Sequence, residues 1–210
     1  MQYLPSAGNF VPVEDLAHIV PKLSYQIYFE KNTTTATTEL NNDIRRSIRA
    51  VHRTIASPPP EAFLSSTTDF LGAWSEFKEI PPPPFYSHQE EDYLVEQFSQ
   101  QKFNYTLQFY TQHNRFESYR LSHEQGNATI PQPALFVAPL EDPVANWTAV
   151  MELLGSAQFI PQLTTKKIHA QHWPHLEAPA EFNRILDEWL EVSVERPQPV
   201  LALQRGGREL

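Results

Sequence analysis

Cysteine is absent from this 210-residue sequence, and glycine, long apolar runs and clustered positive charge are all scarce. Without cysteine the chain has no disulfide, no thiolate nucleophile and no thiolate ligand for a metal. The longest basic runs are the pairs Arg45-Arg46 and Lys166-Lys167, and the net charge is −9. Because phosphate binding requires concentrated positive charge, we predict that nucleic acid is not a partner.

The apolar runs are all far shorter than the ~20 residues that cross a bilayer. The first residues also lack the basic start and the apolar stretch of a signal peptide. We therefore expect a cytoplasmic protein with no membrane partner. A content of 40% hydrophobic and 12% aromatic residues is typical of a globular chain with a sizeable core.

Proline, by contrast, is frequent, and it gathers at positions 58–60 and 81–84. Such runs cannot continue a helix, so they divide the middle of the chain. Ser87, with Glu90 three residues later, is a capping-box signature for a helix start. Apolar residues at helical spacing predict an all-helical block from about Lys22 to Leu121. Its predicted pieces are residues 39–55, residues 62–78, a helix from Ser87, and a further helix after a break near Lys102.

Beyond this block the pattern changes to alternating strands and helices. Residues 134–138 form a short apolar run, as expected of a buried parallel strand, and residues 167–170 are a second strand candidate. A helix is predicted over residues 144–154, and the last helix should start at Pro179. That helix should bury one apolar stripe, made of Phe182, Ile185, Leu186, Trp189 and Leu190. The alternation indicates an α/β fold, but two strands are too few for a doubly wound sheet.

Two residues of this α/β part could carry chemistry. Asp142 follows the first predicted strand and His172 follows the second. The carboxyl ends of parallel strands meet at one edge of a sheet, so a carboxylate and an imidazole can meet there and form a base. The alternative interpretation is structural: Asp142 opens the next helix, and His172 is a packed loop residue.

The string HWPHLEAPAEFNRILDEWL, from His172 to Leu190, resembles the closing segment of α/β-hydrolases of the epoxide-hydrolase and haloalkane-dehalogenase type. In those enzymes the catalytic histidine lies in a Gly-His-Trp or Gly-His-Phe motif, so Trp173 is expected in the substrate pocket. The preceding string PALFVAPLEDPV resembles the strand and acid of the same triad. The order of acid then histidine also agrees with that fold.

The helical block resembles the cap of epoxide hydrolases in particular. The string SYQIYFE is similar to the start of that cap, where a Tyr-Gln-x-Tyr-Phe motif supplies a ring-opening tyrosine, and Tyr25 is the matching residue. The string DYLVEQFSQQKFNYTLQFY is similar to the later cap helix, and its aromatic-Tyr step places Phe109 in the pocket and Tyr110 as the second tyrosine. Two phenols that donate to one epoxide oxygen would stabilise the alkoxide formed on ring opening. The resemblance thus implies hydrolysis of a small apolar epoxide to a diol without a cofactor.

The sequence departs from this family at the nucleophile. It contains neither a Gly-x-Asp-x-Gly elbow nor a His-Gly-x-Pro loop for the oxyanion hole, and Gln171 replaces the usual glycine before the histidine. We therefore expect a partial α/β-hydrolase fold, with a missing N-terminal half or oligomer formation. The expected organisation is the end of a sixth strand and lead-in (1–21), a helical cap (22–121), the C-terminal part of the core (131–192) and a tail (193–210). The proline-rich, tryptophan-containing cap suggests a fungal member of a specialised-metabolite pathway.

Two other functions remain open at this point. The chain could be a non-catalytic remnant that binds an apolar ligand or a partner through its aromatic cap. It could also be a metal-binding module, because His169, His172 and His175 are spaced by three, although they span a strand end and a bend rather than one helical face.

Overall fold

The structure is a computed structural model that describes residues 10–126 and 129–193. The end of a strand expected at the start of the chain, and the tail beyond Ser193, lie outside the described residues. Within residues 10–21 the chain forms a helix and the beginning of a 3₁₀ turn. The helices before residue 127 are α1 (Val13–Ile19), η1 (Pro21–Leu23), α2 (Ser24–Lys31), α3 (Thr33–Asn42), α4 (Ile44–Val51), η2 (Gly72–Trp74), α5 (His88–Gln101), η3 (Thr106–Tyr110) and α6 (Gln112–Glu124). They are followed by β1 (Ala134–Pro139), α7 (Trp147–Leu153), η4 (Ser156–Phe159), β2 (Leu163–Ile168), α8 (Pro174–Glu177) and α9 (Pro179–Ser193).

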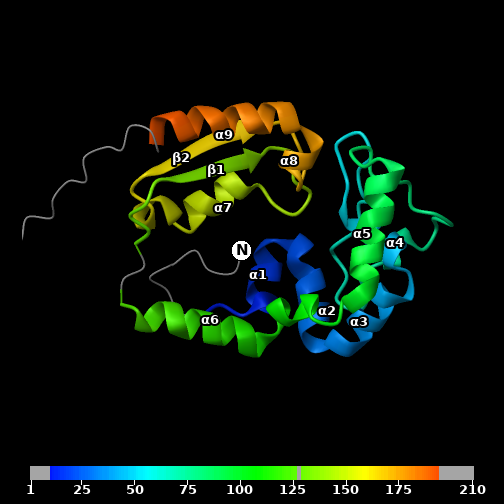
Figure 1. Ribbon diagram of the computed structural model, residues 1–210. Helices are drawn as coiled ribbons and strands as arrows, with labels where there is room; N and C mark the ends of the chain where they lie inside the picture. The colour runs from blue at the N-terminus through cyan, green and yellow to red at the C-terminus, as the bar shows by residue number, and fades with distance from the viewer. Residues whose placement is uncertain (1–9, 127–128, 194–210) are drawn as a thin grey trace, which may run out of the picture.

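The two strands pair in parallel, from Ala134 opposite Leu163 to Pro139 opposite Ile168. This confirms the predicted α/β alternation, although β2 begins four residues earlier than expected. Helices α9 and α7 cover opposite faces of the strand pair (Figure 1). Parallel strands need a crossover connection, and here it contains α7.

Helix α9 starts at Pro179, as predicted, but its apolar stripe is only partly covered. Ile185 is buried against Ile168 and Ala170, whereas Phe182 is half-buried. Leu190 retains 38% of its exposure, so the expected burial of the whole stripe is wrong at that residue.

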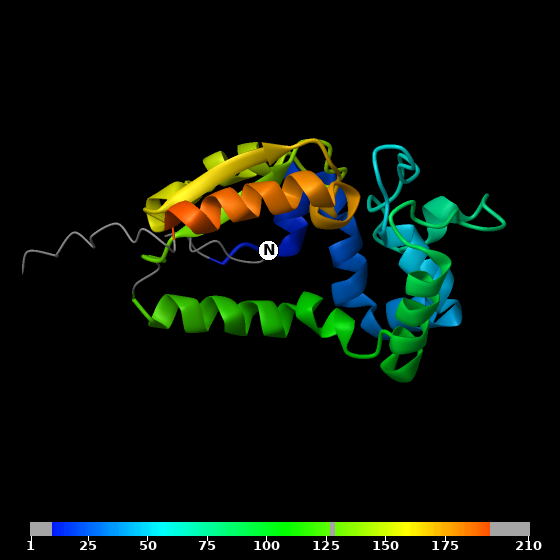
Figure 2. The ribbon, with the colours of Figure 1, turned by 45° about the horizontal axis from the view of Figure 1, so that its top comes forward.

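The helices before residue 127 form a second group beside the strand pair (Figures 1 and 2). The predicted capping box at the start of α5 is confirmed, with the Ser87 and Glu90 side chains each bonded to the backbone of the other. The single helix predicted over residues 39–55 is wrong, because α3 and α4 are separated at Asp43. That residue has an extended backbone and accepts a hydrogen bond from the amide of Arg46, which makes it the N-cap of α4.

The helix predicted over residues 62–78 is also wrong, since this segment is a loop with one short 3₁₀ turn. Its aromatic residues do enter the core, where Phe70 and Trp74 are buried. The backbone is held by carboxylates instead of helical hydrogen bonds: Glu39 accepts from the amides of Phe70 and Leu71, and Asp69 accepts from that of Gly72. The spacing of apolar residues in this segment thus indicates burial and not a helix.

A buried ion pair ties the helices together beneath the aromatic core. Arg49 on α4 donates to both carboxylate oxygens of Glu91 on α5, at 2.5 and 2.9 Å. The Glu91 side chain is only 2% exposed, and it also receives Arg45 at 2.9 Å. The same guanidinium of Arg49 donates to Glu79 and to the carbonyl oxygen of Ile80. A buried carboxylate requires this degree of compensation.

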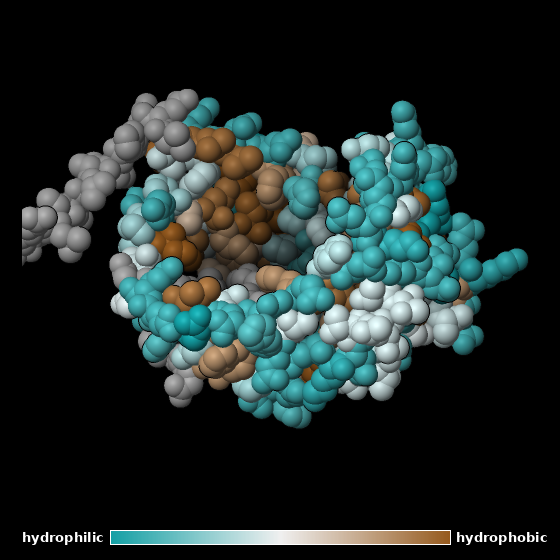
Figure 3. Space-filling view, turned by 60° about the horizontal axis from the view of Figure 1, so that its bottom comes forward, coloured by the Kyte–Doolittle hydropathy of each residue, from teal (hydrophilic) through white to brown (hydrophobic). Residues whose placement is uncertain are grey.

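Helix α6 extends from the helical group underneath the strand pair (Figures 1 and 2). Between them the surface is hollowed, and apolar side chains line much of the wall of this hollow (Figure 3). Large apolar side chains that remain exposed occur on both sides, among them Phe116 and Leu121 of α6 and Leu153 of α7. No described helix is long and apolar enough to cross a membrane.

Candidate active site

The two parallel strands bring an acid and a histidine to the same edge of the sheet. Pairing continues past the strands, because the amide of Leu140 donates to the carbonyl oxygen of Ile168 and that of Glu141 to Ala170. Asp142 and His172 follow directly, and His172 Nδ1 lies 2.8 Å from Asp142 Oδ2. The structure therefore brings together the two residues that the sequence proposed as a pair.

Asp142 is held as a buried acceptor. Its side chain is 1% exposed, and it accepts hydrogen bonds from the amide of Val144 at 2.8 Å and from the indole of Trp147 at 2.5 Å. A carboxylate can only accept, so the third partner, His172 Nδ1, carries the proton in this contact. In the neutral imidazole Nε2 then keeps its lone pair, which is the tautomer that a general base requires. Asp142 also precedes α7 in the chain, but the residue that caps α7 is Asn146.

The loop that carries His172 is fastened to the helical part. The indole of Trp173 donates to the carbonyl oxygen of Val51 at 2.8 Å, at the end of α4. Glu177 accepts from the amide of Gln171 with one oxygen and from the amide of Ile55 with the other, both at 2.7 Å. These bonds fix the position of the imidazole relative to α4.

The two tyrosines named from the sequence lie side by side on the other group of helices. The ring of Tyr25 on α2 and the ring of Tyr110 on η3 have centroids 5.9 Å apart, in an edge-to-face arrangement. Phe29 and Phe70 pack against Tyr25 at 5.4 and 5.7 Å. Burial raises the pKa of both phenols above the ordinary value of 10, most strongly for Tyr25, so both remain protonated hydrogen-bond donors at neutral pH.

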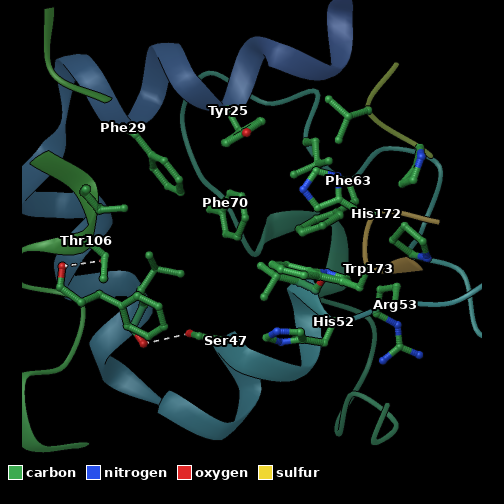
Figure 4. Close-up of a pocket in the computed structure, with 18 of the residues that line it drawn as sticks. Tyr25, Phe29, Ser47, His52, Arg53, Phe63, Phe70, Thr106, His172 and Trp173 are labelled. Atoms are coloured by element: carbon green, nitrogen blue, oxygen red, sulfur yellow. Dashed lines mark hydrogen bonds between the residues drawn. The ribbon is translucent and has the colours of Figure 1, made fainter. Parts of the chain in front are cut away.

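One cavity of about 390 Å³ connects the tyrosines with the histidine loop (Figure 4). Tyr25, Tyr110, His172 and Trp173 all line it, in a wall that is mainly apolar and aromatic. Asp142 lies behind His172 and reaches the cavity only through the imidazole. Phe109, expected from the sequence in the pocket, is not among the lining residues and is 54% exposed. The volume and the lining are typical of a site for a small apolar molecule.

His52 and Gln171 are among the lining residues that the sequence interpretation did not place in the site. The imidazole of His52 stacks on Trp173 with centroids 4.7 Å apart, and burial lowers its pKa. Gln171 is 7% exposed, and its Oε1 has no hydrogen-bond partner among the described residues. Only the contact between α4 and the histidine loop brings His52 to the cavity, so no local pattern could have indicated it.

The histidine triplet does not form a metal site. Within residues 10–126 and 129–193, no group of three or more histidine, aspartate and glutamate side chains is placed to hold a metal ion. His169 is 79% exposed and lies 3.7 Å from Glu141, whereas His172 faces Asp142 and His175 packs against Phe182. The three rings have three different surroundings, so the zinc interpretation is wrong for the described structure.

Comparison with solved structures identifies the fold as that of α/β-hydrolase epoxide hydrolases. Epoxide hydrolase A from Mycobacterium thermoresistibile is similar with a TM-score of 0.69 and 23% sequence identity, covering 89% of this chain and 58% of its own. A mutant epoxide hydrolase from Vigna radiata is similar with a TM-score of 0.66 and 17% identity, covering 91% of this chain and 60% of its own.

Among curated proteins, the chain is similar to bifunctional epoxide hydrolase 2 of Sus scrofa, with 29% identity over 202 residues, and of Rattus norvegicus, with 27% over 198 residues. The matches cover 93% and 92% of this chain, but the chain spans only about a third of the length of these relatives (34% of each). No family model matches the sequence. The chain thus has the α/β-hydrolase fold and is similar in sequence to epoxide hydrolases.

Proposed function

We propose that this chain supplies the cap tyrosines and the histidine–aspartate pair of an epoxide hydrolase, which converts a small apolar epoxide to a diol. The observation that carries the proposal is the single cavity lined by Tyr25 and Tyr110 from one group of helices and by His172 from the other part of the chain. An epoxide is a neutral, largely apolar molecule with one oxygen acceptor. A mainly apolar cavity with two protonated phenols matches that description.

The phenols would act on the epoxide oxygen. When a carbon–oxygen bond of the ring breaks, that oxygen becomes an alkoxide, and hydrogen bonds from Tyr25 and Tyr110 stabilise the developing charge. One phenol passes its proton to the alkoxide, which gives the first hydroxyl group of the diol. Burial suits the phenols to this step, because it keeps them protonated in the resting protein.

His172 would act in the second half of the reaction. A carboxylate nucleophile attacks an epoxide carbon and leaves an ester, and water must then attack the ester carbonyl carbon. With Nδ1–H bonded to Asp142, His172 offers Nε2 to take the proton from that water. The acyl carbon–oxygen bond of the ester breaks, and the substrate oxygen takes the proton from Nε2 as the second hydroxyl group of the diol. The nucleophilic carboxyl group releases its proton, which restores the phenol that was deprotonated in the first half.

The described residues include no aspartate on a nucleophile elbow, so we propose that a further N-terminal half carries the nucleophile and the oxyanion hole. The proline-rich, tryptophan-containing cap supports a fungal specialised-metabolite pathway as the setting, through its resemblance to caps of that type. Residues 22–121 would be the cap domain and residues 131–192 the C-terminal part of the core.

The tyrosine pair can be tested by binding of styrene oxide, a small apolar epoxide. Trp173 lines the cavity, so its fluorescence should change on binding. Tyr25→Phe and Tyr110→Phe should each weaken binding by up to about tenfold, the effect of one lost hydrogen bond. Tyr105→Phe is the matched control, because that residue is 72% exposed and outside the cavity. Equal affinity in all four proteins would contradict the proposal.

A non-catalytic ligand-binding protein is the second candidate, and the aromatic lining of the cavity favours it. This candidate predicts binding of apolar molecules with no epoxide oxygen, such as ethylbenzene, as tightly as styrene oxide. The epoxide-hydrolase proposal predicts a preference for styrene oxide that disappears in the Tyr25→Phe/Tyr110→Phe double variant.

A further inference from the structure

We propose that Gln26, held by Arg115, is a positioning residue that sets the direction of the Tyr25 hydrogen bond, so that the hydroxyl proton of Tyr25 is directed into the cavity. The inference rests on the proposed function for the use of that proton. It concerns two residues that lie beside the cavity and do not line it.

The direction follows from what each side chain can donate. Arg115 Nη2 lies 2.8 Å from Gln26 Oε1, and a guanidinium has donors only. The oxygen of the Gln26 amide therefore faces Arg115, and its nitrogen faces the other way. That nitrogen, Nε2, lies 3.2 Å from the hydroxyl oxygen of Tyr25 and must be the donor in this bond.

The orientation of Gln26 is well supported by its surroundings. The Arg115 side chain is 5% exposed, and its Nη1 lies 3.7 Å from Glu30, whose side chain is 10% exposed. The Arg115 guanidinium also lies over the ring of Tyr110, 5.9 Å from its centroid. An arginine enclosed in this way cannot leave the amide of Gln26 without losing these contacts, so the amide cannot turn over freely.

The consequence falls on the Tyr25 proton. A phenol has one O–H donor, and because its oxygen accepts from Gln26, the proton is left for another acceptor. In the resting protein that acceptor is the hydroxyl of Tyr110 in the cavity wall, and a bound epoxide oxygen would take its place. An amide that donates to the phenol oxygen also stabilises the phenolate, and this hydrogen bond acts to lower the pKa of Tyr25 against the larger effect of burial, which raises it. Gln26 thus favours both the direction and the ease of proton donation to an epoxide oxygen.

Gln26→Glu reverses the direction while preserving the packing. The new carboxylate has almost the same shape, pairs with Arg115, and can only accept, so it would capture the Tyr25 proton. Gln100→Glu is the control, since it makes the same change of charge on an exposed part of α5. Thermal unfolding should show that both variants fold.

The first readout needs no ligand. In the full chain labelled with ¹³C at the ζ carbon of tyrosine, the Tyr25 signal is assigned as the one missing from Tyr25→Phe. Because that carbon carries the hydroxyl, its chemical shift should change when the phenol loses the donor amide of Gln26 and donates to the new carboxylate in Gln26→Glu, and stay unchanged in Gln100→Glu. A Tyr25 signal that is the same in Gln26→Glu as in the parent overturns the inference.

The second readout is binding of styrene oxide in a double-variant cycle. Gln26→Glu should weaken binding by about as much as Tyr25→Phe, up to about tenfold, and should cause no further loss in the Tyr25→Phe background. A full additional loss in that background would overturn the inference, because Gln26 would then act independently of Tyr25. If the Tyr25 signal moves but Tyr25→Phe itself binds normally, the hydrogen-bond direction is supported and the proposed function fails.

Discussion

Asp142 offers the sharpest stability prediction, because three donors converge on one buried carboxylate. In Asp142→Ala, the amide of Val144 and the indole N–H of Trp147 both lose their acceptor. A buried donor without a partner costs ~1–3 kcal/mol, and both bonds are only partly buried, so the lower half of that range applies to each. His172 is 46% exposed and can bond to water instead, so it adds little. The two donors together predict a loss of about 2–4 kcal/mol in the free energy of unfolding.

Asp142→Asn should cost about half as much. Its remaining oxygen can still accept from Val144, whereas its NH₂ group faces two other donors. The assay is urea unfolding followed by tryptophan fluorescence. Glu141→Ala is the control, since its neighbouring carboxylate is 51% exposed and should change stability by less than about 0.5 kcal/mol. If Asp142→Ala is no less stable than Glu141→Ala, the carboxylate of Asp142 does not stabilise the fold through these two donors.

Three further predictions concern the acid response, the loop that carries the histidine, and the chain by itself. The pKa of Glu91 lies below its ordinary value of 4.5, mainly because Arg49 donates to it. The contribution of this pair to the free energy of unfolding should therefore be complete above about pH 4.5 and disappear as the pH falls through the lowered pKa. Glu91→Gln should cost ~3 kcal/mol at pH 7 and flatten that acid response, as measured by chemical unfolding across pH. Trp173→Phe keeps an aromatic ring but leaves the Val51 carbonyl oxygen without its donor, so thermal unfolding should show a loss of about 1 kcal/mol. The 210-residue chain alone should not hydrolyse aryl epoxides above background, and it should bind a hydrophobic dye and oligomerise, because apolar side chains line the hollow in Figure 3.

Each of these has a clear contrary result. If the free energy of unfolding of Glu91→Gln falls at low pH as much as that of the parent, the Arg49–Glu91 ion pair is not the cause of that fall. A Trp173→Phe protein as stable as its parent would show that the bond to Val51 adds nothing. Turnover by the chain alone that is lost in His172→Ala would mean that water is attacked directly or that another nucleophile operates. If the chain is a monomer and binds no dye, the apolar side chains in the hollow do not cause association.

Local signals in the sequence were sufficient for much of the fold. Ser87 with Glu90, and Pro179, mark helix starts through bonds and backbone angles that involve only neighbouring residues. The loop over residues 62–78 could not be predicted in this way. Its backbone is held by Glu39, about thirty residues earlier in the chain, and helical spacing of aromatic residues occurs equally in a loop that folds onto a core.

The sequence could predict those site residues that lie in a recognisable motif, as Tyr25, Tyr110 and His172 do. Phe109 shows the limit of that approach: it is adjacent to Tyr110, but Tyr110 lines the cavity whereas Phe109 does not and is 54% exposed. His52 lies in no such string and reaches the cavity only because the histidine loop docks on α4 through Trp173. Contacts of that kind depend on the tertiary fold.

We propose that epoxides are opened in this cavity and that His172 then activates the water that hydrolyses the ester. This proposal is tested most directly by intact-protein mass spectrometry of the chain completed by a nucleophile-bearing N-terminal half, mixed with styrene oxide. The account predicts that His172→Gln accumulates a covalent adduct with the mass of one styrene oxide, while the parent releases the diol. The adduct should be lost when Tyr25→Phe and Tyr110→Phe are added. Absence of any adduct in His172→Gln, or an adduct that forms equally well without the two phenols, would contradict the account.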